Sequence, residues 1–267
     1  DIEYLIKVGN ATTNDNGTIN YTNFKNKKDT TAKYQLTDFV SKTDSKQKIT
    51  VKAGSSSEVT VNLKVPKQKF PGTIAGGVYV ERLTNSYTNE KNGMNTRNHF
   101  SMTLPVILTE QAKAKRIAKM ELDKVMVKNG PEVIAKLHNV KPVMFGKLSI
   151  DSKITKKNHV KTLIHKNVNN YQVAPNSSFN FLASDSSNQL GAGKYTIDMH
   201  LQSGKRKWHL VKDFTITAKQ GVPLTKRTGW LGISMVMWIV ILILVIIIVG
   251  LVVVIVRQKQ NLKTKNK

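Results

Sequence analysis

Apolar and polar side chains alternate along most of this chain, and that period-two pattern limits its fold more than any other feature. The clearest alternating runs lie at residues 59–65, 100–108, 133–137, 179–183 and 195–201. Each run predicts a strand with one face on a core and the other in water, which is typical of antiparallel sheets. Because the runs are short and separated by turns rich in Asn, Gly, Ser and Lys, the sequence favours an all-β fold of immunoglobulin-like sandwiches.

Glycine and asparagine mark the predicted turns. The sequence Asn14-Asp-Asn-Gly17 joins two alternating runs with residues that tolerate a positive φ. Gly76-Gly77 predicts a bulge or a place where another backbone comes close. None of the glycine-rich turns leads into a helical pattern, so none is typical of a phosphate-binding loop.

The chain has 267 residues, which is enough for about two domains. The stretch 111–120 has a helix-favouring composition without a wide apolar face, and it is predicted to be a connector. We therefore expect a first β-sandwich at residues 1–112 and a second at 116–220. Alternation begins at Ile2 without an initiator methionine or an apolar signal segment, so the first sandwich is expected to be truncated at its N-terminus.

Residues 230–256 carry no charge, and five basic residues without an acid follow them. An apolar run of this length predicts a transmembrane helix, because it can cross a hydrocarbon core of roughly 30 Å. The basic tail, residues 257–267, is expected to stay in the cytoplasm by the positive-inside rule. The sequence thus predicts a single-pass cell-membrane protein with its N-terminal part outside the cell.

The composition excludes several classes of function. The chain has no cysteine, which rules out disulfide scaffolds, thiolate zinc sites and cysteine nucleophiles. Its net charge of +25 favours anionic partners such as wall polymers, although a lysine-rich solvated surface gives the same number. A nucleic-acid partner is not expected, because no recognition helix and no aromatic stacking platform is evident.

No catalytic, cofactor-binding or metal-binding residue is assigned from the sequence. The six histidines form no short-spaced zinc motif, and His159 and His165 are expected to face solvent. The acids of the second domain look isolated in strands or turns, which argues against a glycosidase carboxylate pair; they are Asp151, Asp185, Asp198 and Asp213. The serine-nucleophile motif is also absent, so the chain is not expected to be an enzyme and needs no cofactor.

The aromatic residues give one core prediction and one open question. Trp208, Phe214 and Ile216 share a strand parity and are expected in the core of the second sandwich. Tyr79 and Tyr87 lie near the Gly76-Gly77 turn and are either sugar-stacking residues or ordinary strand tyrosines. The residues that bind a ligand therefore stay unassigned.

A series of short motifs, in order, carries a family resemblance. They are ATTNDNGTINY at 11–21, VP at 65–66, FPGTIAGGV at 70–78, LHN at 137–139, APNSSFNF at 174–181, GKY at 193–195, Trp208 and FTI at 214–216. With the apolar C-terminal segment, this order resembles the WxL-interacting proteins of low-GC Gram-positive bacteria. The resemblance covers nearly all of residues 1–256 and departs from the family at the front, where a signal peptide and an opening strand or two are missing.

The resemblance implies a cell-surface protein with a peptidoglycan-binding first domain and a host-binding second domain. It also implies WxL-domain surface proteins as partners, besides peptidoglycan or anionic wall polymers and a host extracellular matrix protein. The expected function is therefore to tether these partners at the envelope, with sheet-edge pairing at the strand around Pro105 as a mechanism. The alternatives are a subunit of a wall-modifying enzyme and a passive structural stalk.

Overall fold

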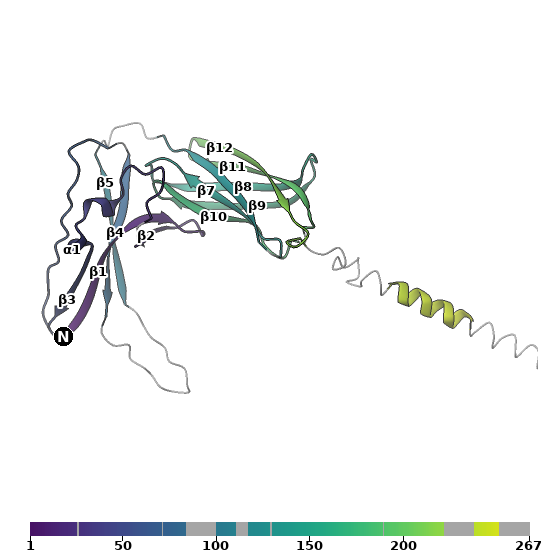
Figure 1. Ribbon diagram of the computed structural model, residues 1–267, viewed down its shortest axis with the longest axis horizontal. Helices are drawn as coiled ribbons and strands as arrows, with labels where there is room; N and C mark the ends of the chain where they lie inside the picture. Colours follow the sequence, from purple (N-terminus) through teal and green to yellow (C-terminus); the bar gives the residue numbers. More distant parts are fainter. Residues whose placement is uncertain are drawn as a thin grey trace, which may run out of the picture.

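The structure is a computed structural model that describes residues 1–25, 27–70, 72–83, 100–110, 117–128, 130–188, 190–221 and 238–250. The N-terminal elements are β1 (Ile2–Thr13), β2 (Ile19–Asn23), the 3-10 helix η1 (Leu36–Phe39), α1 (Lys42–Ser45), β3 (Lys46–Val51), β4 (Thr73–Arg82) and β5 (Ser101–Thr109). The next strands are β6 (Met120–Val127), β7 (Val133–Asn139), β8 (Phe145–Lys156), β9 (Thr162–Val173), β10 (Ser177–Ser184), β11 (Gly193–Ser203) and β12 (Arg206–Ile216). Figure 1 shows these strands as two bodies that lie side by side, the N-terminal sheet and the C-terminal sandwich.

The N-terminal sheet contains β1 to β5, all paired antiparallel in the order β2-β1-β4-β5. Strand β1 is long enough to pair with β3 along its first half and with β2 along its second half. Gly76 lies in β4 opposite Asn10, and a Cβ built there would lie 2.3 Å from the carbonyl oxygen of Gly9. The predicted close approach of another backbone at Gly76-Gly77 is therefore confirmed.

One face of the N-terminal sheet has a small core. Val8, Ile74 and the other sheet residues pack against Leu36 and Phe39 of η1 and against Phe70. The cover is thus a short helix and extended chain, and the described residues contain no second sheet there. In the described residues, the region predicted to be a truncated first sandwich forms a single five-stranded sheet with an irregular cover.

The predicted strand at 59–65 is also wrong, since it forms only one isolated bridge, between Leu63 and Val40. The backbone of this segment makes hydrogen bonds to a backbone carbonyl and a side chain, and it does not pair with a neighbouring strand. The carbonyl of Phe39 accepts a hydrogen bond from the Lys64 amide at 2.7 Å, and the Asp44 carboxylate accepts one from the Asn62 amide at 3.2 Å. The alternation still has a structural meaning, because Val61 packs against the core.

The C-terminal sandwich is built from two antiparallel sheets. One has the order β10-β7-β6 and the other the order β12-β11-β8-β9. The predicted strands at 133–137, 179–183 and 195–201 are confirmed as parts of β7, β10 and β11. The antiparallel β-fold expected from the alternation is thus observed, and here it closes over a core between two sheets.

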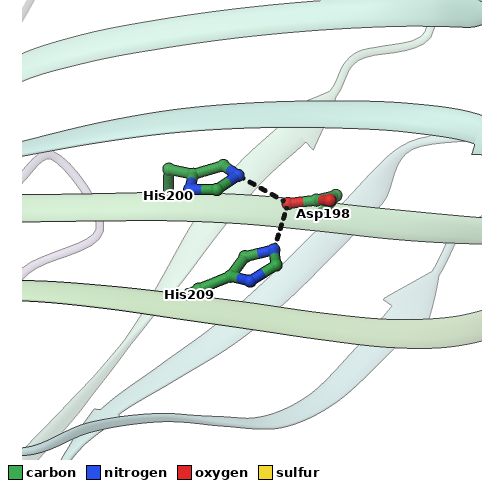
Figure 2. A group of neighbouring side chains, drawn as sticks. All are labelled: Asp198, His200 and His209. Carbon is green, nitrogen blue, oxygen red and sulfur yellow. Dashed lines mark hydrogen bonds and ion pairs between the residues drawn. The ribbon is translucent and has the colours of Figure 1, made fainter.

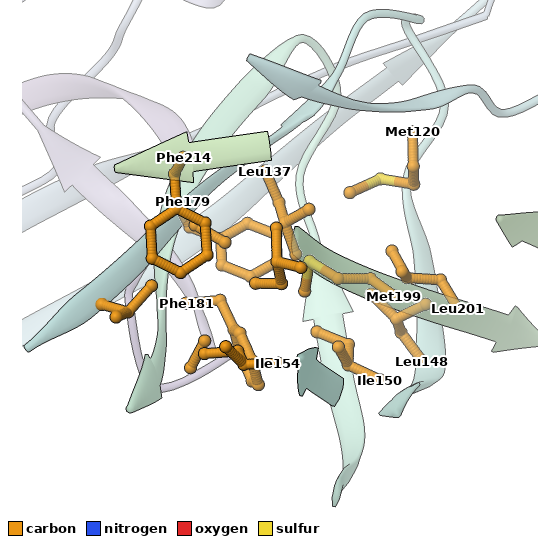
Figure 3. Close-up of a cluster of buried hydrophobic side chains, with 14 of the residues drawn as sticks. Met120, Leu137, Leu148, Ile150, Ile154, Phe179, Phe181, Met199, Leu201 and Phe214 are labelled. Carbon is orange, nitrogen blue, oxygen red and sulfur yellow. The ribbon is translucent and has the colours of Figure 1, made fainter. Parts of the chain in front are cut away.

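The core of the sandwich is formed by the inward face of every strand (Figure 3). Leu137, Phe181 and Met199 are almost completely buried and come from three different strands. The predicted aromatic face of β12 is confirmed, because Phe214 is buried and Trp208 packs against the same cluster. At full burial each such side chain stabilises the fold by roughly 1.5–3 kcal/mol.

The expectation of a transmembrane helix at 230–256 is overturned. Near the C-terminus the structure describes residues 238–250, which are helical. Among the residues that the structure describes, no helix has both the length and the apolarity to cross a membrane. The single-pass membrane location is corrected accordingly, while residues 230–237, 251–256 and the tail 257–267 lie outside the described residues.

Candidate functional site

The two bodies meet at a junction that is held by buried hydrogen bonds. Thr13, at the end of β1, uses its backbone amide to donate to Ser177 Oγ at 2.8 Å. Its own Oγ1 accepts from the Ala174 amide at 3.0 Å. All three residues are buried, and Ala174 packs with Ala11 and Ala75 of the N-terminal sheet. The junction therefore has its own small apolar cluster and satisfied polar groups.

The turn after β1 extends this junction. The Asp15 carboxylate accepts from the Asn180 amide at 2.8 Å, and the Gly17 carbonyl accepts from the Gln172 amide at 2.7 Å. Gly17 has a φ of 76°, and a Cβ there would lie 2.1 Å from a Tyr171 ring carbon. Burial, with a smaller contribution from the charge of Asp15, raises the pKa of Tyr171 above its ordinary value. The turn thus requires glycine both for its backbone and for the aromatic ring above it.

A second connection joins the start of β4 to the loop after β7. The amide of Thr73 donates to the Pro142 carbonyl at 2.7 Å. Gly72 has a φ of 90°, and a Cβ there would lie 2.2 Å from the same carbonyl oxygen. Asn139, which is fully buried, donates to the carbonyls of Val143 and Ala174 and so fixes the loop that receives Thr73.

His138 connects the two bodies beside this loop. Its Nε2 lies 3.1 Å from the Asp29 carboxylate of the N-terminal part, and its Nδ1 lies 3.4 Å from Asp123 Oδ1 of β6. The His138 side chain is 8% exposed, and both carboxylates are partly exposed. The two ring nitrogens of His138 thus contact one carboxylate from each body, and the residue bridges the junction.

A cleft of about 640 Å³ opens at this bridge, lined by residues from both bodies. Its charges are largely paired within the protein. Lys28 Nζ lies 2.7 Å from the Asp38 carboxylate, and Lys136 Nζ lies 3.6 Å from Asp123. On the cleft wall, the hydrogen bond from Lys119 lowers the pKa of Glu121. The cleft therefore presents paired ions, hydroxyls and amides, which suit a polar ligand with hydrogen-bonding groups more than a polyanion.

An exposed apolar face lies on β5, which is an edge strand of the N-terminal sheet in the described part of the chain. Val106 and Leu108 pack against the core, and the same face continues toward Phe100, where its side chains are exposed. Phe100, Met102 and Leu104 are 66%, 69% and 64% exposed. In the described part of the chain β5 pairs only with β4, so its other edge is free. We call residues Phe100, Met102 and Leu104 the β5 apolar face.

The structure also shows the contacts and the exposure of the tyrosines, histidines and acids discussed in the sequence analysis. Tyr79 contacts Phe24 at 5.4 Å between ring centroids, while Tyr87 lies outside the described residues. His159 and His165 are exposed, as predicted. Each acid considered for a carboxylate pair contacts another kind of residue: Asp151 contacts His165, Asp185 contacts Ser187, Asp198 contacts two histidines and Asp213 contacts Lys157.

Sequence reasoning missed the junction and its cleft, because the contacts that join the two bodies connect residues that are far apart in the chain. A signal was nevertheless present. Four of the motifs that carry the family resemblance meet at the junction; they lie at 11–21, 70–78, 137–139 and 174–181. These motifs therefore mark how the two bodies are joined rather than two separate surfaces.

Comparison with protein families gives two matches that together span most of the chain. Residues 1–82 match the peptidoglycan binding domain of WxL Interacting Protein, and residues 91–226 match the host binding domain of WxL Interacting Protein. A search of curated proteins finds no match. Both matched families are binding domains, which agrees with a protein that is not an enzyme.

Proposed function

Because the chain belongs to the WxL-interacting proteins, we propose that it tethers a WxL-domain protein by docking a strand of that partner on β5. The chain is a cell-surface binding protein with a peptidoglycan-binding and a host-binding domain. The observation that carries the proposal is the β5 apolar face, which continues the core of the N-terminal sheet beyond its cover.

Docking on β5 would satisfy two needs of an edge strand. A partner strand would hydrogen-bond to the free backbone edge, and its apolar side chains would cover Phe100, Met102 and Leu104. Burying one large apolar side chain contributes about 1.5–3 kcal/mol, so three such residues can supply a specific contact. Pro105 removes one donor along β5, as is usual on edge strands, so a docked strand would bind to the remaining donors and acceptors.

Leu104→Asp tests this proposal against the matched control Ile107→Asp. Both residues are exposed on β5, but Ile107 lies on the opposite face of the strand. The full chain and both variants would be immobilised and titrated with a purified WxL domain at low and high salt. We expect salt-resistant binding that Leu104→Asp abolishes and Ile107→Asp retains. Equal binding by both variants, or binding that disappears as salt rises, would contradict docking on the apolar face.

The cleft at the junction supports a second function for the same protein, which is to bind a fragment of peptidoglycan. A volume of about 640 Å³ is in the range of small-ligand sites, and its paired charges and amides match the hydroxyls and peptide groups of a muropeptide. Phosphate-rich wall polymers fit the cleft less well, because two of the lysines that line it, Lys28 and Lys136, already have carboxylate partners. The basic surface outside the cleft remains the better place for such polymers.

Ser178→Trp would fill the cleft, since Ser178 lines it. The control is Ser149→Trp, because Ser149 lies on the outward face of the other sheet of the sandwich. A soluble muropeptide should bind the control like the original chain and fail to bind Ser178→Trp. Undiminished binding by Ser178→Trp would exclude the cleft as the site. A passive stalk predicts no saturable binding of muropeptide or WxL domain by any of these proteins.

A further inference from the structure

The outward face of the four-stranded sheet carries a group of histidines and acids that the junction does not use. In the register of β11 and β12, His200 lies directly opposite His209. Asp198 precedes His200 by two residues on β11, so all three side chains leave the sheet on the same face. The sheet pairing therefore creates a cluster that no local sequence spacing reveals.

Figure 2 shows both imidazole rings directed at the Asp198 carboxylate. Asp198 Oδ1 lies 3.2 Å from His200 Nε2 and 2.9 Å from His209 Nε2. The two rings are stacked, with centroids 4.3 Å apart and an angle of 11° between their planes. One ligand atom from each of the three residues lies within 4.8 Å of the others.

These distances are close to those of a metal site. Zinc binds histidine nitrogen and carboxylate oxygen at about 2.0–2.2 Å, which places tetrahedral ligand atoms roughly 3.4 Å from one another. The side chains are 41–59% exposed, so small rotations can bring the ligand atoms to that separation. A cation among them would take the place of the protons that otherwise link both rings to the carboxylate.

We propose that Asp198, His200 and His209 form a surface site for a divalent transition-metal ion of the zinc class. Two imidazole nitrogens and one carboxylate oxygen favour such an ion over Mg²⁺ and Ca²⁺, which prefer oxygen ligands. Three protein ligands leave a coordination position open to water, and the exposed setting gives the ion a direct path from solvent.

The neighbouring strands add charge without adding a competing ligand set. Asp151 of β8 lies opposite His200 in the register, and its carboxylate contacts His165 of β9 and lies 4.0 Å from Lys153 Nζ. Asp151 thus contributes negative potential beside the site and has its own partners. Among the described residues only one histidine, His165, contacts Asp151, whereas two histidines contact Asp198. The test compares substitutions at these two places.

Calorimetric titration of the full chain with zinc chloride, with any histidine tag removed, tests the proposal. We expect one ion per chain. Replacing His200 or His209 by alanine should weaken binding by at least the ~10–100-fold that loss of an outer-shell partner costs. The matched control is His165→Ala, which removes an exposed histidine from the same face and should leave the zinc affinity unchanged.

A second readout identifies the ligands directly. Stoichiometric Ni²⁺ or Cu²⁺ should broaden the imidazole NMR signals of His200 and His209 before those of His159, which lies in the turn after β8. The proposal fails if zinc gives no saturable heat, if binding survives the double variant of His200 and His209, or if His165→Ala alone abolishes it. Because all these side chains are exposed, the variants should keep the fold of the original chain.

Discussion

Replacing Thr13 by valine should loosen the junction between the N-terminal sheet and the C-terminal sandwich. Valine keeps the shape of threonine but removes Oγ1, which accepts the Ala174 amide at 3.0 Å. Ala174 is fully buried, so water cannot replace the lost acceptor. A buried amide without a partner costs about 1–3 kcal/mol. At about 2 kcal/mol, opening of the junction becomes roughly 30-fold more frequent.

Hydrogen exchange measured residue by residue is the appropriate assay, because unfolding of two bodies need not be two-state. The Ala174 amide should exchange faster in Thr13→Val, together with the neighbouring amides of the junction. The control is Thr12→Val, whose hydroxyl makes no hydrogen bond to the described residues. Unchanged exchange at Ala174 in Thr13→Val, or equal acceleration in both variants, would refute the reasoning.

Three further changes have expected outcomes. Gly76→Ala should lower the free energy of opening of the surrounding amides by about 1–3 kcal/mol in residue-by-residue hydrogen exchange, because its Cβ would meet the Gly9 carbonyl. Asn139→Ala should cost about 1–3 kcal/mol in the same assay, since two buried carbonyls lose their donor. The hydrogen bond from Lys157 lowers the pKa of Asp213 from its ordinary 3.8, so this contact stabilises the fold above pH 3.8 and is lost as pH falls through the lowered value. Asp213→Asn should therefore reduce the loss of stability measured by acid titration below pH 3.8.

Local periodicity predicted a strand correctly where the apolar face of the strand packs on a core and the polar face is in water. The run at 195–201 became β11, because its apolar face enters the sandwich core and its polar face meets water. The run at 59–65 has the same pattern but no free strand beside it, so it covers the sheet as extended chain. Alternation thus reports which side chains share one face of an extended segment, while burial of that face and ladder formation depend on a partner elsewhere in the chain.

The candidate sites depend on contacts that local patterns do not contain. His138 bridges to Asp29 across the junction, and His200 meets His209 through the register of a hairpin. Neither pair has a short sequence spacing, so a search for zinc or catalytic motifs passed over both. The motifs of the family resemblance gave an indirect signal, because Thr13, Asn139 and other members of these motifs meet at one place in the structure.

The most direct test of the central claim is a bridging assay on purified peptidoglycan. Insoluble peptidoglycan would be incubated with a WxL domain in the presence or absence of the full chain, at low and high salt, and washed. We predict that the WxL domain is retained at both salt concentrations only when the chain is present, and that Leu104→Asp releases the WxL domain while the chain itself stays on the wall. Retention of the chain without the WxL domain would contradict the tethering function.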